Sequence, residues 1–485
     1  MKKMNLLVMS LVSAAALSFS SCSNNDDLTS GGGSNQSKVE GFYMTFAVQT
    51  PTSNGTRTQQ PTDENFKVAG TTEETKITSG TFYLVNQKTK KIVFTKNITA
   101  SELNNAAPES PVKGTTTTKI EVPVQDVDEN VNYIVYFLAN TTDAKPWENT
   151  YTAQTGFTGA YATDNNFVMF NQNDKNSKAD KYIVKFEAAN KEISNPAKVS
   201  ETIMLDRVTA RIDKPETEAT SITAKYPEGA DAKKKAAIDA EIAKVKTVTQ
   251  NNYAITNLSN MTNIMQKWVE ATWTSLQIPT GTTHMQKSED LGDQWTLNNY
   301  GWFANAKKNY VFENTKETPT TMYFEYVLGL DETKFTDTPD FTDGTFYRYN
   351  GVIYRSIAAI YKAYQDQPIL FGGKTAEALK GELKITAEGK IGASPTELAK
   401  FRKDNVIEVF VEGKTYYSQV IIDKWLNANT IQRNTVYRLN VKKIYNLGAD
   451  VPNGKPDENK PMYYLDVEVS VNPWVLSTQD VNLGE

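Results

Sequence analysis

The sequence predicts an all-β fold, mainly β with short helical inserts, arranged as two β-sandwich domains in tandem. Three observations lead to this fold class. Segments in which apolar and polar residues alternate with period two recur along the chain, as in strands with one buried face. The composition includes 24 Tyr and 20 Phe residues, which favour strands. With 485 residues, the chain is long enough for more than one hydrophobic core.

The first residues have the pattern of an export signal. Lys2 and Lys3 precede an apolar run, and small residues lead to Cys22, the one Cys of the chain. This pattern predicts a secretory signal over residues 1–21. Small residues directly before a lone Cys are typical of a bacterial lipobox, in which the signal is cut before the Cys and the thiol carries lipid. The alternative is an ordinary signal peptide with an incidental Cys.

A first strand is predicted over residues 41–50, after a polar stretch with the composition of a flexible tether. Its alternation gives one apolar face, and this face predicts a buried side. The residues on that face are Phe42, Met44, Phe46 and Val48. Together with Cys22, the strand belongs to a predicted lipidated propeptide over residues 22–57.

The next segment, "PTSNGTRTQQPTDENF", is polar and rich in Pro, Gly and Asn, so nothing in it predicts packing. Exposed loops of this kind are preferred sites of proteolysis. A trypsin-like protease would cut between Arg57 and Thr58. The alternative is an ordinary Arg in a loop between two strands.

A β-domain is predicted over residues 58–205. Residues 81–85 and 92–96 read as a hairpin, and the nearly continuous apolar run 131–140 reads as a central strand. Further strands are predicted in residues 182–188 and 201–213. These segments are sufficient for one sandwich.

A second β-domain is predicted over residues 206–448, with two helical segments among its strands. Residues 231–246 predict a helix because Ile238, Ile242 and Val245 fall on one face. Residues 356–366 predict a second helix with Ser356 as its N-cap. The predicted strands and hairpins are 321–330, the hairpin 346–355 on Asn350-Gly351, the hairpin 406–422, and 434–448.

The last segment, 449–485, predicts a flexible linker followed by a strand. Apolar residues alternate with Asp466, Glu468, Ser470 and Asn472 over this strand. The apolar positions are Leu465, Val467, Val469 and Val471, with Trp474 close behind. Because the strand follows a polar linker, its apolar face could complete either a neighbouring molecule's sheet or the chain's own sheet.

The composition excludes several kinds of chemistry. The net charge of −5 argues against a nucleic-acid-binding protein, whose contact surface would be basic. With one Cys and one His, the chain cannot form an intrachain disulfide or a Cys/His zinc cluster. A Ser-His-Asp triad would need His284, which is predicted to be an exposed loop residue. We therefore predict no catalytic residue, no metal and no cofactor.

Several motifs together resemble the fimbrillins of Bacteroidales type V pili, including the Mfa-type shaft fimbrillins. They are the lipobox, the strand before an Arg-containing loop, "LDRVTARI" (205–212), "RNTVYRLNVKKIYNLG" (433–448) and the closing "LDVEVSVNPW" (465–474). The resemblance implies two transthyretin-like, Greek-key β-sandwich domains. It also implies export as an outer-membrane lipoprotein carrying lipid (palmitate) on Cys22.

The resemblance further implies maturation and assembly into a cell-surface fimbrium that mediates adhesion and biofilm formation. An Arg-specific protease of trypsin-like specificity would cut the Arg57–Thr58 bond and release the strand that holds Phe42, Met44, Phe46 and Val48. The C-terminal strand of an identical or related pilin subunit would then fill the groove, head to tail. Its donor residues would be Leu465, Val467, Val469, Val471 and Trp474.

Two other functions are consistent with the sequence. One is a monomeric, surface-exposed outer-membrane lipoprotein that binds glycan, on a platform formed by Trp268, Trp273, Trp295 and Trp302. The other is a secreted hydrolase that uses two carboxylates, because the sequence does not give the distance between acidic side chains.

Overall fold

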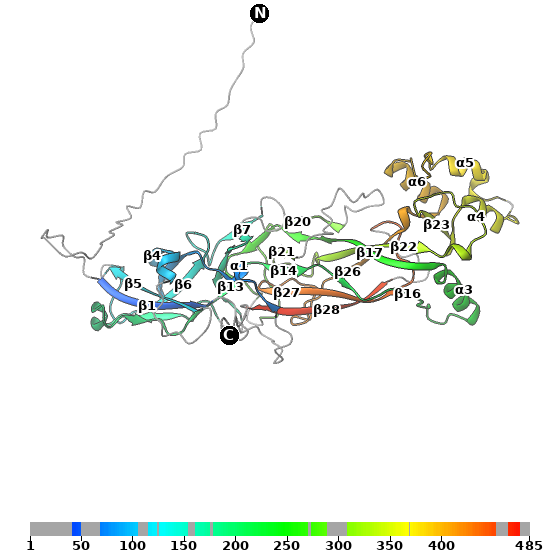
Figure 1. The fold of residues 1–485 in the computed structure, drawn as a ribbon. Coiled ribbons are helices and arrows are strands. Elements are labelled where there is room, and N and C mark those ends of the chain that lie inside the picture. Colours follow the sequence, from blue (N-terminus) through cyan, green and yellow to red (C-terminus); the bar gives the residue numbers. More distant parts are fainter. Residues whose placement is uncertain are drawn as a thin grey trace, which may run out of the picture. The chain divides into compact units, whose positions relative to one another are not determined.

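The fold is mainly β, as predicted, in the computed structural model of the chain (Figure 1). The structure describes residues 41–49, 68–104, 115–123, 126–153, 161–174, 178–269, 273–288, 308–367, 369–452 and 464–475. Most strands belong to two large sheets, one formed mainly by the first half of the chain and one by the second. None of the described helices is long and apolar enough to cross a membrane.

The first sheet has nine strands, with the order β12-β1-β13-β10-β6-β3-β4, while β5 pairs with β1 and β11 pairs with β6. Its strands are β1 (Gly41–Gln49), β3 (Ser79–Asn86), β4 (Ile92–Thr99), β5 (Thr115–Pro123), β6 (Asn132–Ala139), β10 (Met169–Asn171), β11 (Ile183–Lys185), β12 (Ala197–Lys198) and β13 (Ile203–Arg207). The helix α2 (Ala100–Asn104) follows β4. The predicted hairpin of β3 and β4 and the central position of β6 are confirmed.

Both faces of this sheet are buried. Along β6, Val135 and Phe137 belong to one hydrophobic cluster, whereas Tyr136 and Leu138 belong to another. Successive side chains of a strand point to opposite faces, so the two clusters cover the two sides. This burial explains why the β6 sequence is apolar nearly throughout and does not alternate.

The second sheet has seven strands, with the order β2-β28-β27-β14-β21, while β15 and β16 also pair with β27. Its strands are β2 (Val68–Ala69), β14 (Ala210–Asp213), β15 (Glu216–Thr217), β16 (Ile222–Thr223), β21 (Lys308–Val311), β27 (Thr435–Tyr445) and β28 (Tyr464–Val475). A three-stranded sheet shares its hydrophobic core and consists of β17 (Val245–Thr256), β22 (Thr321–Leu330) and β26 (Lys414–Val420). These two sheets therefore form two layers around one core.

Short strand pairs complete the β-structure. They are β7 (Thr150–Thr152) with β19 (Met261–Asn263), β8 (Ala162–Thr163) with β9 (Asn166–Phe167), and β18 (Leu258–Ser259) with β20 (His284–Met285). The β7–β19 pair joins residues from the two halves of the chain. The chain itself crosses from the first large sheet to the second between Arg207 and Ala210.

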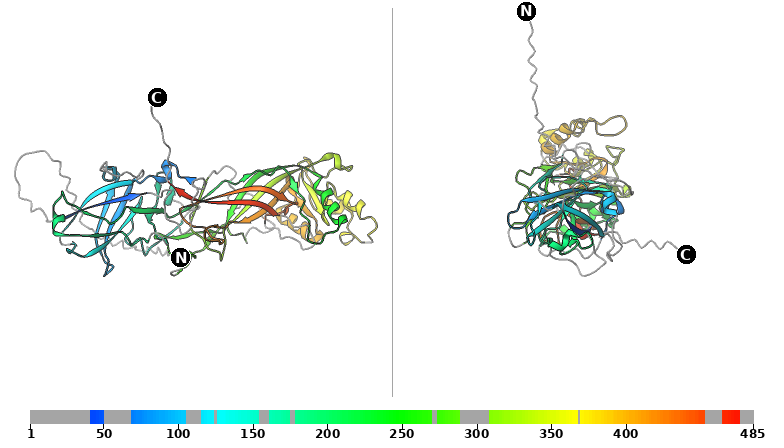
Figure 2. Two further views of the ribbon diagram at one scale, coloured as in Figure 1. Left: turned by 90° about the horizontal axis from the view of Figure 1, so that it is seen from below. Right: turned by 90° about the vertical axis from the view of Figure 1, so that its left-hand side faces the viewer.

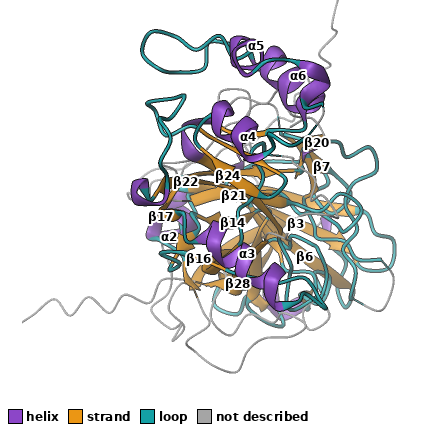
Figure 3. Cartoon of the chain, turned by 90° about the vertical axis from the view of Figure 1, so that its right-hand side faces the viewer, coloured by secondary structure: helices purple, strands orange, loops and turns teal. Residues whose placement is uncertain are grey.

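An insertion separates β22 from its antiparallel neighbour β26. Its elements are β23 (Phe346–Tyr349), β24 (Val352–Tyr354), α4 (Ile357–Ala363), α5 (Ala376–Gly381), α6 (Pro395–Asn405) and β25 (Glu408–Phe410). Its ten-residue core cluster is separate from the other clusters and includes Tyr347, Ile360 and Phe401. Figure 3 shows α5 and α6 side by side, apart from α3 (Ala232–Ile242).

Most local predictions in the second half are confirmed. The helix predicted over residues 231–246 ends at Ile242, because Val245 already belongs to β17, and one predicted hairpin is wrong. Asn350 and Gly351 have φ values of 49° and 80° in the β23–β24 turn, and the Ser356 hydroxyl caps α4. Residues 406–422 do not form a hairpin, because β25 pairs with β23 whereas β26 pairs with β22. A left-handed turn at Glu412 and Gly413 separates the two strands and directs them into different sheets.

A buried polar cluster lies where the chain crosses between the large sheets. We call Glu74, Arg207, Arg211 and Asn434 the junction cluster. The Glu74 carboxylate, on helix α1 (Thr72–Thr75), accepts hydrogen bonds from Arg211 Nη1 at 3.0 and 3.1 Å. Arg207 donates from Nε to the Glu74 carbonyl oxygen at 2.8 Å and from Nη1 to Asn434 Oδ1 at 2.9 Å. The cluster thus joins α1, the crossing segment and the start of β27.

The charge on Glu74 is strongly stabilised. Burial by itself raises the pKa of a carboxyl, but Lys308, Arg211 and the Tyr310 hydroxyl outweigh it and lower the Glu74 pKa to about 2. Lys308 Nζ and Tyr310 Oη lie 2.8 and 2.7 Å from Glu74 Oε1. The fully buried Glu74 carboxylate thus accepts hydrogen bonds from two cations, Arg211 and Lys308, and from the Tyr310 hydroxyl.

Removing this charge should destabilise the fold. We expect Glu74→Gln to lower the free energy of unfolding at pH 7 by about 3 kcal/mol, since the folded-state pKa lies below the ordinary value. The Glu74 contribution is present above the ordinary pKa of 4.5 and is lost as pH falls towards 2. Urea unfolding from pH 7 to pH 2 measures both effects. Exposed Glu73→Gln is the control, and equal pH 7 midpoints for wild type and Glu74→Gln would contradict the assignment.

Candidate functional site at the two terminal strands

The first described strand, β1, lies inside the first sheet. One edge pairs antiparallel with β5 from Gly41 opposite Pro123 to Gln49 opposite Thr115. The other edge pairs in parallel with β12 and then with β13. A strand at the beginning of the described chain therefore has hydrogen-bonded partners on both edges.

The predicted apolar face of β1 is buried in the core. The four residues predicted from the alternation are between 0% and 2% exposed: Phe42, Met44, Phe46 and Val48. The Phe46 ring lies 4.9 Å from the Phe82 ring and 5.8 Å from the Phe137 ring, between centroids. The Phe42 ring lies 5.4 Å from that of Phe186. Taking β1 away would leave an apolar trench and two unpaired strand edges.

The last described strand, β28, lies in the chain's own second sheet. It runs antiparallel to β27 over ten residue pairs, from Tyr464 opposite Tyr445 to Pro473 opposite Thr435. Figure 2 shows β28 in red beside β27 in orange. The predicted donor positions stand opposite buried residues of β27: Leu465 opposite Ile444, Val467 opposite Val441, Val469 opposite Leu439, and Val471 opposite Tyr437.

The far end of β28 meets the chain that follows the predicted cut. Trp474 pairs in parallel with Val68, and Val475 pairs with Ala69, both in β2. β2 is followed directly by α1, whose Glu74 belongs to the junction cluster. The segment after the predicted cut therefore contacts both the end of β28 and the crossing between the sheets.

Cys22, Arg57 and Thr58 lie outside the described residues. The lipid attachment and the cut thus stay predictions. The part of the predicted propeptide that the structure does describe is β1.

The residues considered for other chemistry have structural contacts. His284 is half-buried in β20 rather than exposed in a loop, and its Nε2 lies 3.0 Å from Asn314 Oδ1. Trp268 is 9% exposed and donates from Nε1 to the Asn173 carbonyl oxygen at 2.8 Å. Trp295 and Trp302 lie outside the described residues. Within the described segments, no group of three or more His, Cys, Asp or Glu side chains could hold a metal ion.

Glu74 and Arg433 were not singled out individually from the sequence. Arg433 is 2% exposed, and its Nη2 lies 2.8 Å from Glu313 Oε2 while Nη1 donates to the Ile264 carbonyl oxygen at 2.7 Å. The signal that pointed to this region was the pair of motifs "LDRVTARI" and "RNTVYRLN". The structure brings them together through Arg207 and Asn434.

The arrangement defines a mainly β protein whose first and last described strands each lie in a different large sheet. A family model described as "Major fimbrial subunit protein type IV, Fimbrillin, C-terminal" matches residues 408–480, which include β27 and β28. This part of the chain is therefore similar to the C-terminal region of fimbrillins, and the resemblance to fimbrillins is confirmed.

Several solved structures of bacterial proteins are similar to this chain. A putative cell adhesion protein from Parabacteroides distasonis is 16% identical, with 91% of this chain and 100% of that chain covered and a TM-score of 0.46. A fimbrilin from Porphyromonas gingivalis is 14% identical, with coverages of 90% and 99% and a TM-score of 0.41. No curated protein matches the sequence significantly.

The burial of β1 leads to a stability prediction. We expect Phe46→Ala to lower the free energy of unfolding of residues 23–485 by about 3–5 kcal/mol, because it leaves a cavity between Phe82 and Phe137. Thr45→Ala, on the half-exposed face of the same strand, is the matched control. Chemical unfolding measures the difference. Equal midpoints for the two variants would mean that β1 does not contribute to the core of the uncut protein.

Proposed function

We propose that this chain is a structural subunit of a cell-surface fimbrium, exported as an outer-membrane lipoprotein and polymerised by strand exchange after proteolysis. The fimbrillin C-terminal match over residues 408–480 carries the proposal. A fimbrillin subunit interacts with other fimbrial subunits and has a structural rather than an enzymatic role. The remaining steps rest on the two terminal strands.

In this proposal β1 is a placeholder in the first sheet. Cutting at Arg57–Thr58 separates β1 from the rest of the chain, so it can leave. Its four buried apolar side chains stabilise the uncut protein by about 6–12 kcal/mol before entropy costs. A trench with unpaired strand edges then favours the addition of a new strand, because pairing satisfies backbone groups and burial removes apolar surface from water.

β28 of the next subunit is the proposed occupant. Its four alternating apolar positions match the number and spacing of those of β1. When β28 leaves its own sheet, it loses ten residue pairs with β27. When β1 leaves, it loses nine residue pairs with β5. Exchange by itself is therefore close to balanced, and the irreversible cut drives it. A head-to-tail contact of this kind does not close on itself, so it builds a filament.

We propose that the precursor is located at the outer membrane and that the mature subunit is located in the fimbrium. Lipid on Cys22 would hold the precursor at the membrane, and removal of residues up to Arg57 would release the subunit from that anchor. The proposed partners are identical or related pilin subunits and the maturation protease. Adhesion and biofilm formation are the proposed roles of the assembled fibre.

The position of the cut can be tested with trypsin. We expect limited trypsin treatment of residues 23–485 to produce a new N-terminus at Thr58 and then filaments visible by electron microscopy. Arg57→Ala should abolish both, because trypsin requires a basic residue before the cut. Lys67→Ala, directly after this polar stretch, is the matched control and should behave like wild type. Filaments from Arg57→Ala would show that the cut lies elsewhere.

Whether β28 must separate from β27 for assembly can be tested with a disulfide that links the two strands. Leu439 and Val469 are opposite in the β27–β28 ladder, where Cα atoms lie about 4.5–5.5 Å apart, a separation that a disulfide spans. Residues 23–485 contain no Cys, so Leu439→Cys with Val469→Cys introduces the only thiols. We expect the oxidised double variant to be cut by trypsin without forming filaments, and reduction to restore them.

Leu439→Cys alone is the control for the altered core. It should polymerise under both oxidising and reducing conditions. If the oxidised double variant formed filaments as readily as the reduced one, β28 would not be the donor strand. The fimbrial assignment would then need a different donor segment.

A further inference from the structure

A cavity of about 400 Å³ lies between helix α3 and the β23–β24 hairpin. Helix α3 contributes Lys234, Ile238 and Ile242, and the hairpin contributes Arg348 and Ile353. Leu447 adds a surface from the segment after β27. The volume falls within the range of about 300–1,000 Å³ that is typical of small-molecule sites.

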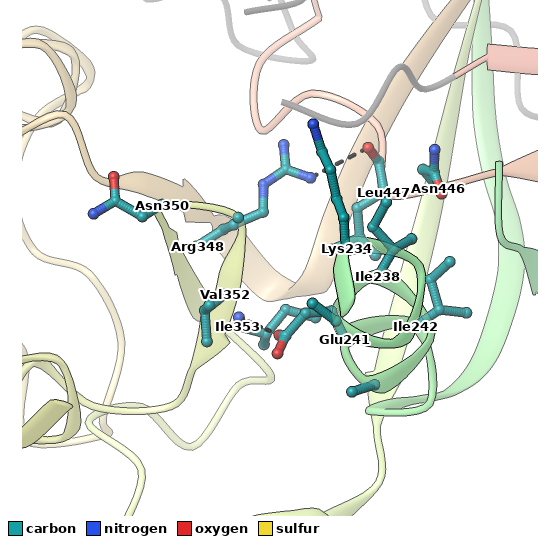
Figure 4. Close-up of a pocket in the computed structure, with 13 residues that line it drawn as sticks. Lys234, Ile238, Glu241, Ile242, Arg348, Asn350, Val352, Ile353, Asn446 and Leu447 are labelled. Carbon is teal, nitrogen blue, oxygen red and sulfur yellow. Dashed lines mark hydrogen bonds between the residues drawn. The ribbon is translucent and has the colours of Figure 1, made fainter. Parts of the chain in front are cut away.

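The lining of the cavity combines charged and apolar side chains. Figure 4 shows Lys234 and Arg348 close to Leu447 and Ile238, whereas Val352, Ile353 and Ile242 lie around the Glu241 carboxylate. A ligand that fills this space must therefore carry a polar head and an apolar body. Water alone would leave the apolar wall without favourable contacts.

Most polar groups at the cavity already have protein partners. Glu241 accepts from Lys244 Nζ at 2.8 and 2.9 Å and from the Ile353 amide at 2.7 Å. Arg348 donates to both oxygens of the Glu408 carboxylate. The Asn446 side chain is hydrogen-bonded to the backbone of Lys225.

Lys234 differs from these groups. Its side chain is exposed at the cavity, and among the described residues it forms no ion pair with a carboxylate. The site therefore offers a positive charge that a ligand can neutralise. The apolar side chains of the lining offer hydrocarbon that a ligand chain can cover.

The packing of α3 supports an occupied cavity. Of its eleven residues, Ile238 is the one that is buried, and Ala237 and Ala240 stay exposed while lining the cavity. Most helical stability in proteins comes from burying an apolar face. Within the protein, Ile238 is the residue of α3 that is buried. An apolar ligand beneath α3 would add further apolar contacts to this helix.

We propose that this cavity binds an amphiphile with one anionic head group and an unbranched apolar chain, of the chemical class of a medium-chain fatty acid. The carboxylate pairs with Lys234, and the chain lies against Ile242, Val352 and Ile353. A sugar would leave the apolar side chains of the lining uncovered, and a cation would meet Lys234. This inference does not rest on the proposed strand exchange.

The test is calorimetric titration of residues 23–485 with decanoate below its micellar concentration, and with decanol as the uncharged counterpart. We expect saturable binding of decanoate that Lys234→Glu weakens by about tenfold or more, since an attraction becomes a repulsion. Decanol binding should change by less than about twofold, because decanol carries no charge. Lys233→Glu is the matched control, with the same change of net charge on α3 at a residue that does not line the cavity.

Ala240→Trp and Ala237→Trp test the cavity itself. Both residues are exposed, so a large side chain is tolerated by the fold, and circular dichroism and thermal melting check this. Each variant should abolish binding of both ligands by filling the space. Absence of decanoate binding to wild type, or undiminished binding to both Trp variants, would overturn the proposal. Equal effects of Lys234→Glu and Lys233→Glu would overturn the role of Lys234.

Discussion

The buried carboxylate of Glu74 is the constraint on which the arrangement of the two large sheets depends. A buried charge is costly unless it is paired and hydrogen-bonded, so α1 is stable only where Arg211 and Lys308 reach it. Arg207 extends the same network to Asn434, at the start of β27. Because removing one partner leaves the others buried and uncompensated, the network holds the crossing segment, α1 and β27 together as a unit.

The two terminal strands are held in different ways, and the difference bears on which of them can move. β1 is paired on both edges, with β5 on one side and with β12 and β13 on the other. β28 has one long ladder with β27, and among the described strands its other edge meets β2 at Trp474 and Val475. Detaching β28 therefore breaks one long ladder and two residue pairs with β2, whereas detaching β1 breaks pairing along both of its edges. In the proposed assembly this is why β1 needs a cut to leave, whereas β28 can leave intact.

Alternation along the chain was sufficient to predict β1, because period two is a local property and the four buried residues follow it without a break. The turn at Asn350-Gly351 was equally visible, since a type I′ turn requires left-handed residues. The hairpin predicted over residues 406–422 was wrong because alternation does not specify the partner strand. The partners, β23 and β22, lie about sixty to one hundred residues earlier in the chain.

The polar contacts at the junction were beyond the reach of local patterns. Glu74 is 137 residues from Arg211 and 234 from Lys308, and no spacing within a short segment reports such pairs. The same limit applies to β2, whose two residues show no strand pattern, and which is defined by its partner β28. These non-local contacts fix the first described residues after the proposed cut, Val68 and Ala69. Thr58 lies ten residues before Val68, so in the proposed maturation the new N-terminus is tied to the end of β28 and, through Glu74, to the junction cluster. In this proposal one cut acts on both strands. It separates β1 from the rest of the chain, so β1 can leave its groove. It also places β2, which pairs with the end of β28, close to a free N-terminus.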